Sequence, residues 1–104
     1  GFLEHVQRIG NYAKQQFASL IADHPSVFQD VRGEGLMLGL KMRVPNMAFI
    51  DALRAHGMLA IAAGDNVVRL LPPLIIDESH VREAMEKVSA TARDFEAASK
   101  AAVA

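Results

Sequence analysis

Large apolar residues recur every three or four positions from residue 2 to residue 21, and this spacing constrains the fold more than any other feature. They are Phe2, Val6, Ile9, Ala13, Phe17 and Leu20. An α-helix repeats every 3.6 residues, so this spacing places all of them on one helix face. Pro25 ends the pattern, because a proline disfavours helical backbone in the residue before it. The sequence therefore predicts an amphipathic helix over residues 2–21.

The middle of the chain has a different pattern, in which short apolar runs alternate with glycine, proline and asparagine. These runs predict four strands, at residues 27–31, 36–40, 58–62 and 67–71. The run at 36–40 is almost continuously apolar, as in a strand that is covered on both faces. Pro72 and Pro73 follow the fourth run and prevent an ordinary continuation of its hydrogen-bonded ladder.

Two further helices are predicted, at residues 45–57 and 77–95, with Asn46 and Asp77 as their N-caps. The expected order is α-β-β-α-β-β-α. It indicates an α+β fold, in which helices pack on one small, mostly antiparallel sheet. The alanine-rich tail at 97–104 is expected to fray.

Composition limits the class of protein. The chain has 104 residues, 51% of them apolar, which suits one domain over residues 1–104 with its own core. Eleven basic and twelve acidic residues give no electrostatic footprint for nucleic acid or an anionic membrane. No apolar stretch approaches the roughly 20 residues of a membrane-spanning helix, and no signal peptide is visible. Cysteine is absent, which fits a reducing compartment such as the cytoplasm.

Several side-chain types that support catalysis or metal binding have no suitable arrangement. The histidines (His5, His24, His56 and His80) lack metal-ligand spacing and are expected at solvent-facing helix ends. The serines lie in helical or capping contexts and offer no nucleophile. None of the lysines considered (Lys14, Lys41, Lys87 and Lys100) suggests a Schiff base. We therefore expect neither a metal site nor a catalytic residue within this chain.

Gly33 and Gly35 resemble the start of a dinucleotide-binding fingerprint. That motif needs a third glycine at position 38, which is leucine, and a helix where a strand is predicted. A tight turn or bulge between two strands is the favoured interpretation.

Arg69 is the residue that stands out, because apolar residues flank it on both sides in the fourth predicted strand. A guanidinium removed from water needs a carboxylate or phosphate partner, and its planar fork suits a carboxylate. An arginine that simply extends to solvent remains the alternative and, on these residues alone, the commoner case. Arg32 is a weaker candidate, because it follows a predicted strand beside a flexible turn, where a surface salt bridge is more common.

Two segments carry a resemblance to a known family. They are Val31-Arg32-Gly33-Glu34-Gly35-Leu36-Met37-Leu38-Gly39 and Ala63-Gly64-Asp65-Asn66-Val67-Val68-Arg69-Leu70-Leu71-Pro72-Pro73-Leu74. With them, nearly the whole chain resembles the C-terminal small domain of class III pyridoxal-phosphate aminotransferases, and within that class the acetylornithine aminotransferases. The second segment is the more specific of the two.

The resemblance implies a parent enzyme that uses pyridoxal phosphate and works as a homodimer, with its active site between a large and a small domain. Its reaction would transfer an amino group between N-acetylornithine and 2-oxoglutarate in arginine biosynthesis. Arg69 matches the family residue expected to bind the α-carboxylate of glutamate or 2-oxoglutarate. The cofactor-binding residues belong to the family's large domain, so this chain is expected to bind no cofactor and to be inactive alone.

Two alternatives stay open. The parent could be another class III ω-aminotransferase acting on ornithine, succinylornithine or 4-aminobutyrate, because that choice depends largely on large-domain residues. The chain could instead be a free-standing amino-acid-binding regulatory module, because small α+β folds serve many functions. Gly1 in place of methionine and the immediate helical pattern favour a piece of a longer protein.

Overall fold

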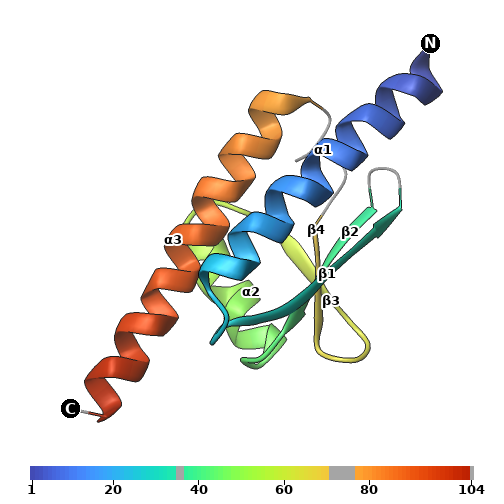
Figure 1. Ribbon diagram of the computed structural model, residues 1–104. Coiled ribbons are helices and arrows are strands. Elements are labelled where there is room, and N and C mark those ends of the chain that lie inside the picture. The colour runs from blue at the N-terminus through green and yellow to red at the C-terminus, as the bar shows by residue number, and fades with distance from the viewer. Residues whose placement is uncertain (35–36, 71–76, 104) are drawn as a thin grey trace.

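The computed structural model describes residues 1–34, 37–70 and 77–103 (Figure 1). Its elements follow the predicted order: α1 (Phe2–Asp23), β1 (Phe28–Glu34), β2 (Met37–Met42), α2 (Asn46–Ala55), β3 (Ala60–Ala63), β4 (Val67–Leu70) and α3 (Glu78–Val103). The predicted α+β class is confirmed. The glycine at 35, the leucine at 36, the residues from 71 to 76 (both prolines included) and the last alanine lie outside the described residues.

The four strands form one antiparallel sheet in the order β1-β2-β4-β3. β4 therefore lies between β2 and β3, although it is the last of the four strands in the sequence. The register aligns four residues in a single row across the sheet: Arg32, Gly39, Arg69 and Ile61. Side chains directly opposite one another on paired strands point to the same face, so this row shares one face of the sheet.

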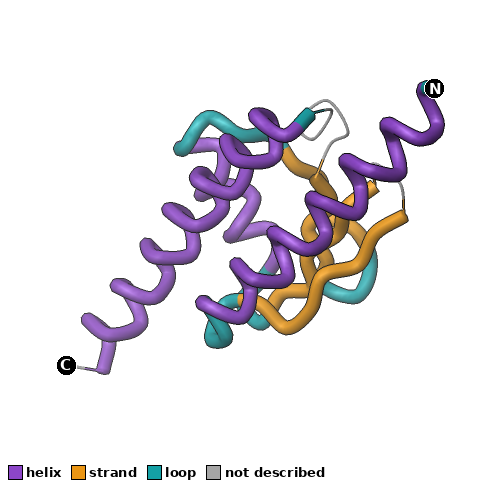
Figure 2. The backbone as a smooth tube through the Cα atoms, turned by 45° about the horizontal axis from the view of Figure 1, so that its top comes forward, coloured by secondary structure: helices purple, strands orange, loops and turns teal. Residues whose placement is uncertain are grey.

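The helices cover the other face. α1 packs on β1, α2 on β3 and β4, and α3 against both other helices; Figure 2 shows the strands together on one side of them. One core cluster joins alternate strand residues such as Leu40 and Val68 to helix residues such as Phe17 and Phe49. The fold thus has two layers, and its single core lies between helices and sheet.

Several strands begin or end one to three residues away from the predicted positions. β1 continues to Glu34, so Arg32 lies inside a paired strand and not beside a flexible turn. β2 is covered on one face only, because Leu38 and Leu40 enter the core while Gly39 and Lys41 face away from it. α3 continues as helix to Val103. The fraying of the 97–104 tail stays a prediction.

The two predicted helix caps had different outcomes. Asp77 is confirmed, since its Oδ1 accepts a hydrogen bond from the His80 backbone N–H at 3.0 Å. Asn46 is not the N-cap of α2; Pro45 occupies that position. The Asn46 side chain instead donates to the carbonyls of Ala63 and Val67 on the neighbouring strands. Tertiary contacts here outcompete the local cap.

Within the described ranges, no helix combines the length and apolar character needed to cross a membrane.

Candidate functional site

Arg69 lies on the sheet face that turns away from the helices. Its neighbours in β4, Val68 and Leu70, are completely buried in the core, while Arg69 itself is exposed. Of the two interpretations that the sequence left open, the exposed position of Arg69 in this chain matches the arginine that extends to solvent. Strand residues alternate between faces, so sequence neighbours of Arg69 are not its neighbours in space.

An open depression of about 380 Å³ lies beside Arg69 on this face. Its lining comes from β1, β2, the end of β3, the β3–β4 connection and β4: Arg32, Gly33, Leu38, Gly39, Ala63, Gly64, Val67 and Arg69. Gly39 separates the two arginines in the cross-strand row. Because glycine has no side chain, the middle of the row is left open between two guanidinium-bearing positions.

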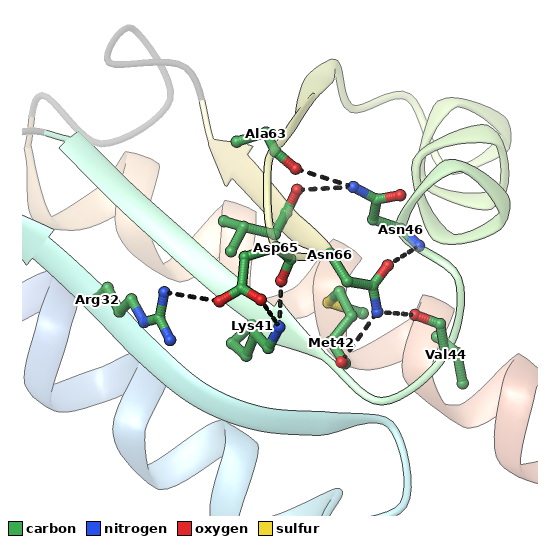
Figure 3. A network of polar contacts seen from close by, with 9 residues as sticks. Arg32, Lys41, Met42, Val44, Asn46, Ala63, Asp65 and Asn66 are labelled. Carbon is green, nitrogen blue, oxygen red and sulfur yellow. Dashed lines mark hydrogen bonds and ion pairs between the residues drawn. The ribbon is translucent and has the colours of Figure 1, made fainter.

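Asp65 pairs with two cationic side chains, Lys41 and Arg32, on the sheet face that carries Arg69 (Figure 3). Its carboxylate lies 2.9 Å from the ammonium of Lys41 and 3.5 Å from the guanidinium of Arg32, and its backbone carbonyl also accepts a hydrogen bond from Lys41. Lys41, by hydrogen bond and charge, lowers the pKa of the Asp65 carboxyl, and Arg32 adds a smaller effect. Asp65 is therefore an anion that forms ion pairs with both Lys41 and Arg32.

Arg69 differs from both of them. Among the residues that the structure describes, no hydrogen bond or ion pair is made by its guanidinium. An exposed guanidinium beside an open depression can donate two parallel hydrogen bonds to a carboxylate. The structure thus brings Arg32 and Arg69 to one pocket, and leaves Arg69 as the available anion-binding group within the described part of it.

The histidines are not all at solvent-facing positions. His24 is 9% exposed, and its Nδ1 lies 2.9 Å from Glu96 Oε1 while its Nε2 lies 3.3 Å from Ser89 Oγ. His56 pairs with Asp94 at 2.8 Å. The carboxylate partners lie far along the sequence, in α3, so spacing alone gave no signal for these pairs.

The series Ser89–His24–Glu96 has the order of a hydrolytic triad but lacks its surroundings. Ser89 lies within α3, where backbone N–H groups are used by the helix and cannot stabilise an oxyanion. Its hydroxyl also accepts a hydrogen bond from Arg93 at 2.9 Å. These contacts join the end of α1 to α3, which is a structural role. Within the described residues, no group of histidine and carboxylate side chains could hold a metal ion.

Comparisons with known proteins agree with the sequence resemblance. The family model described as aminotransferase class-III matches residues 1–92. An acetylornithine aminotransferase of Mesorhizobium japonicum is 47% identical over 93 residues, which cover 89% of this chain and 23% of that protein. The acetylornithine aminotransferase of Brucella melitensis biotype 1 is 49% identical over 88 residues, covering 85% of this chain and 22% of that protein.

Solved structures give the same answer for the fold. N-acetylornithine aminotransferase from Stenotrophomonas maltophilia superposes with a TM-score of 0.79 at 31% identity, covering 91% of this chain and 27% of that one. Ornithine delta-aminotransferase from Plasmodium falciparum has a TM-score of 0.79 at 25% identity, with 88% and 24% covered. The chain spans about a quarter of the length of the relatives it matches. On this evidence, the chain belongs to the class III aminotransferase family.

Proposed function

We propose that residues 1–104 are the C-terminal small domain of a longer acetylornithine aminotransferase, which transfers an amino group between N-acetylornithine and 2-oxoglutarate. The bacterial relatives named above carry that name and support this choice. Their much greater length supports a large domain in the same polypeptide.

In this proposal Arg69 binds the α-carboxylate of glutamate or 2-oxoglutarate. One observation carries the assignment: Arg69 is exposed on an open pocket, and no described residue pairs with it, whereas Lys41 and Arg32 are paired with Asp65. A bidentate arginine–carboxylate contact is strong and directional, so it would also orient the substrate.

Pyridoxal phosphate, which supplies the amino-transfer chemistry in this class, is proposed to bind residues of the large domain. The described pocket supports this placement, because its lining contains no lysine with which the cofactor could form a covalent bond. Lys41, on the same sheet face, is held by Asp65. We further propose that the full-length enzyme is a cytoplasmic homodimer. Residues 1–104 without the large domain are proposed to be inactive.

The test is single-turnover kinetics of each half-reaction in the full-length protein, with Arg69→Ala and Arg69→Lys. Removing the contact costs about 2–4 kcal/mol, because the substrate charge is left unpaired in a closed site. The 2-oxoglutarate half-reaction should therefore slow about thirty- to a thousand-fold in kcat/KM for Arg69→Ala. Arg69→Lys should restore only part of it, because an ammonium lacks the planar fork.

Arg82→Ala is the matched control, because Arg82 is an exposed arginine on α3, away from the sheet face that carries Arg69. It should leave both half-reactions unchanged. If both Arg69 variants also keep the 2-oxoglutarate step within about twofold of wild type, Arg69 is a solvated strand residue and the assignment is wrong.

Ornithine is the second candidate donor, because an ornithine aminotransferase superposes as well as an acetylornithine enzyme does. Comparing kcat/KM for N-acetylornithine, succinylornithine, ornithine and 4-aminobutyrate decides between them. The gene sequence upstream of Gly1 tests the remaining alternative. A large domain with a cofactor lysine there supports the enzyme, and a start codon directly before Gly1 supports a free-standing binding module.

A further inference from the structure

Two asparagines join the start of α2 and the connection before it to the connection that precedes β4 (Figure 3). Asn66 Oδ1 accepts a hydrogen bond from the Asn46 backbone N–H at 2.8 Å. Asn66 Nδ2 donates to the carbonyls of Met42, at 3.0 Å, and Val44, at 2.9 Å. In return, Asn46 Nδ2 donates to the carbonyls of Ala63, at 3.3 Å, and Val67, at 3.1 Å. We call this reciprocal pair the amide clamp.

The amide clamp uses nearly all of its hydrogen-bonding capacity on backbone groups. An asparagine amide has two N–H donors, and both are satisfied in each of the two residues. The backbone N–H of Met42 also donates a hydrogen bond to the backbone carbonyl of Asn66, at 3.0 Å. Removing either side chain leaves part-buried carbonyls without their donors, which is costly.

Asn66 also has a backbone conformation that few residues adopt. Its φ is 57°, and that of Asp65 is 65°. Both lie in the left-handed region, where asparagine, aspartate and glycine are the residues best tolerated. Asn66 therefore combines a turn that its residue type permits with a side chain that reaches the end of β2.

Asn66 of the amide clamp directly precedes β4, the strand that carries Arg69. Asn46 binds the carbonyl of Val67, the first residue of β4. Val67 pairs with Lys41 of β2 and Ala63 of β3, and Arg69 follows two residues later on the same face. Fixing Val67 against both neighbouring strands thus fixes the position from which Arg69 reaches the pocket.

We propose that Asn46 and Asn66 are positioning residues for Arg69: the amide clamp holds β4 in the register and orientation that present the guanidinium to a carboxylate. This inference rests on the proposed function of Arg69. It extends that function, because it assigns control of carboxylate affinity to two residues outside the pocket lining.

The experiment is a double-mutant cycle in the full-length protein with Asn66→Gly and Arg69→Ala. Glycine adopts the positive φ at position 66 freely, so Asn66→Gly removes the side-chain bonds without straining the turn. Misplacing a binding group by a fraction of an ångström weakens a directional contact, so the KM for 2-oxoglutarate should rise about tenfold. In the Arg69→Ala background, the same substitution should change the 2-oxoglutarate step by less than about twofold, because nothing is left to position.

Ser89→Ala is the matched control, since it also removes side-chain hydrogen bonds but lies in α3. It should lower the unfolding midpoint without changing the KM for 2-oxoglutarate. If Asn66→Gly does not fold, Asn46→Ala takes its place, because alanine is well tolerated at the start of a helix. This substitution removes the two hydrogen bonds from the Asn46 side chain to the carbonyls of Ala63 and Val67.

The outcomes separate the two proposals. Equal effects of Asn66→Gly with and without Arg69, or no effect on KM, show that the amide clamp is only structural. That result leaves the proposed role of Arg69 intact. If Arg69→Ala itself has no effect on the 2-oxoglutarate step, the proposed function fails and the positioning role fails with it.

Discussion

Gly39 lies directly opposite Arg69 in the β2–β4 pair, so the arginine side chain stands beside a position with no side chain at all. A Cβ built at Gly39 would lie 3.0 Å from Val67 Cγ1. The missing side chain therefore serves both the packing of Val67 and the opening of the pocket.

Gly39→Ala should lower the free energy of unfolding by about 1 kcal/mol, because Val67 must move to admit the new methyl group. Gly64→Ala is the matched control, since nothing lies within 4 Å of a Cβ built there. Denaturant unfolding of both variants measures the difference. Equal stabilities would show that Val67 adjusts at no cost.

Phe49→Ala should lower the free energy of unfolding by about 3–5 kcal/mol, because it opens a cavity in the core. Phe49 is fully buried, with ring centroids 5.4 Å from Phe28 and 5.6 Å from Phe95. Met47→Ala, on the exposed side of the same helix, should change stability by less than about 0.5 kcal/mol. A small loss for Phe49→Ala would mean that the core is not packed as described.

The N-cap of α3 should make stability depend on pH under acidic conditions. The Ser79 hydroxyl and then the His80 backbone N–H lower the pKa of Asp77 from 3.8 to about 2. A depressed pKa means that the carboxylate stabilises the fold above pH 3.8 and loses this effect as the pH falls to about 2.

Unfolding of wild type and Asp77→Ala should therefore differ in its pH dependence. At neutral pH the free energy of unfolding should be larger for wild type than for Asp77→Ala. This difference should shrink as the pH falls from 3.8 to about 2, because Asp77 loses its charge there. If the difference in the free energy of unfolding between the two proteins does not change with pH, the charge of Asp77 contributes nothing and only its hydrogen bonds matter.

His24→Ala should lower the free energy of unfolding by about 1–3 kcal/mol, because it removes a buried group that links α1 to α3. His56→Ala offers a comparison, since the His56–Asp94 pair is more exposed and should contribute less than about 1 kcal/mol. Thermal unfolding ranks the two variants. The opposite order would contradict a structural role for His24.

The 104-residue chain mixed with pyridoxal phosphate should form no stoichiometric imine at one lysine. The described pocket lining has no lysine, and Lys41 and Lys87 are paired with Asp65 and Glu83. Borohydride reduction followed by peptide mass spectrometry should find only weak modification spread over surface lysines. Complete modification of a single lysine would contradict the placement of the cofactor in the large domain.

The periodicity of the sequence determined the number, type and order of the elements. The spacing of Phe2, Ile9 and Phe17 specifies a helix face, because helical geometry depends on local neighbours. Asp77 was predictable as a cap for the same reason, since its partner is three residues away. The resemblance of the segment around Arg69 indicated the family.

Tertiary structure decided everything that depends on strand pairing. The row Arg32, Gly39, Arg69 comes from three strands, and no local spacing encodes their register. The sequence could not show that Asp65 pairs with Lys41 and Arg32 while Arg69 stays unpaired among the described residues. Nor could it show that Asn46 binds a neighbouring strand in preference to capping its own helix. A side chain finds its partners only after distant segments have packed together, so the chemistry of this face is a property of the fold and not of any one segment.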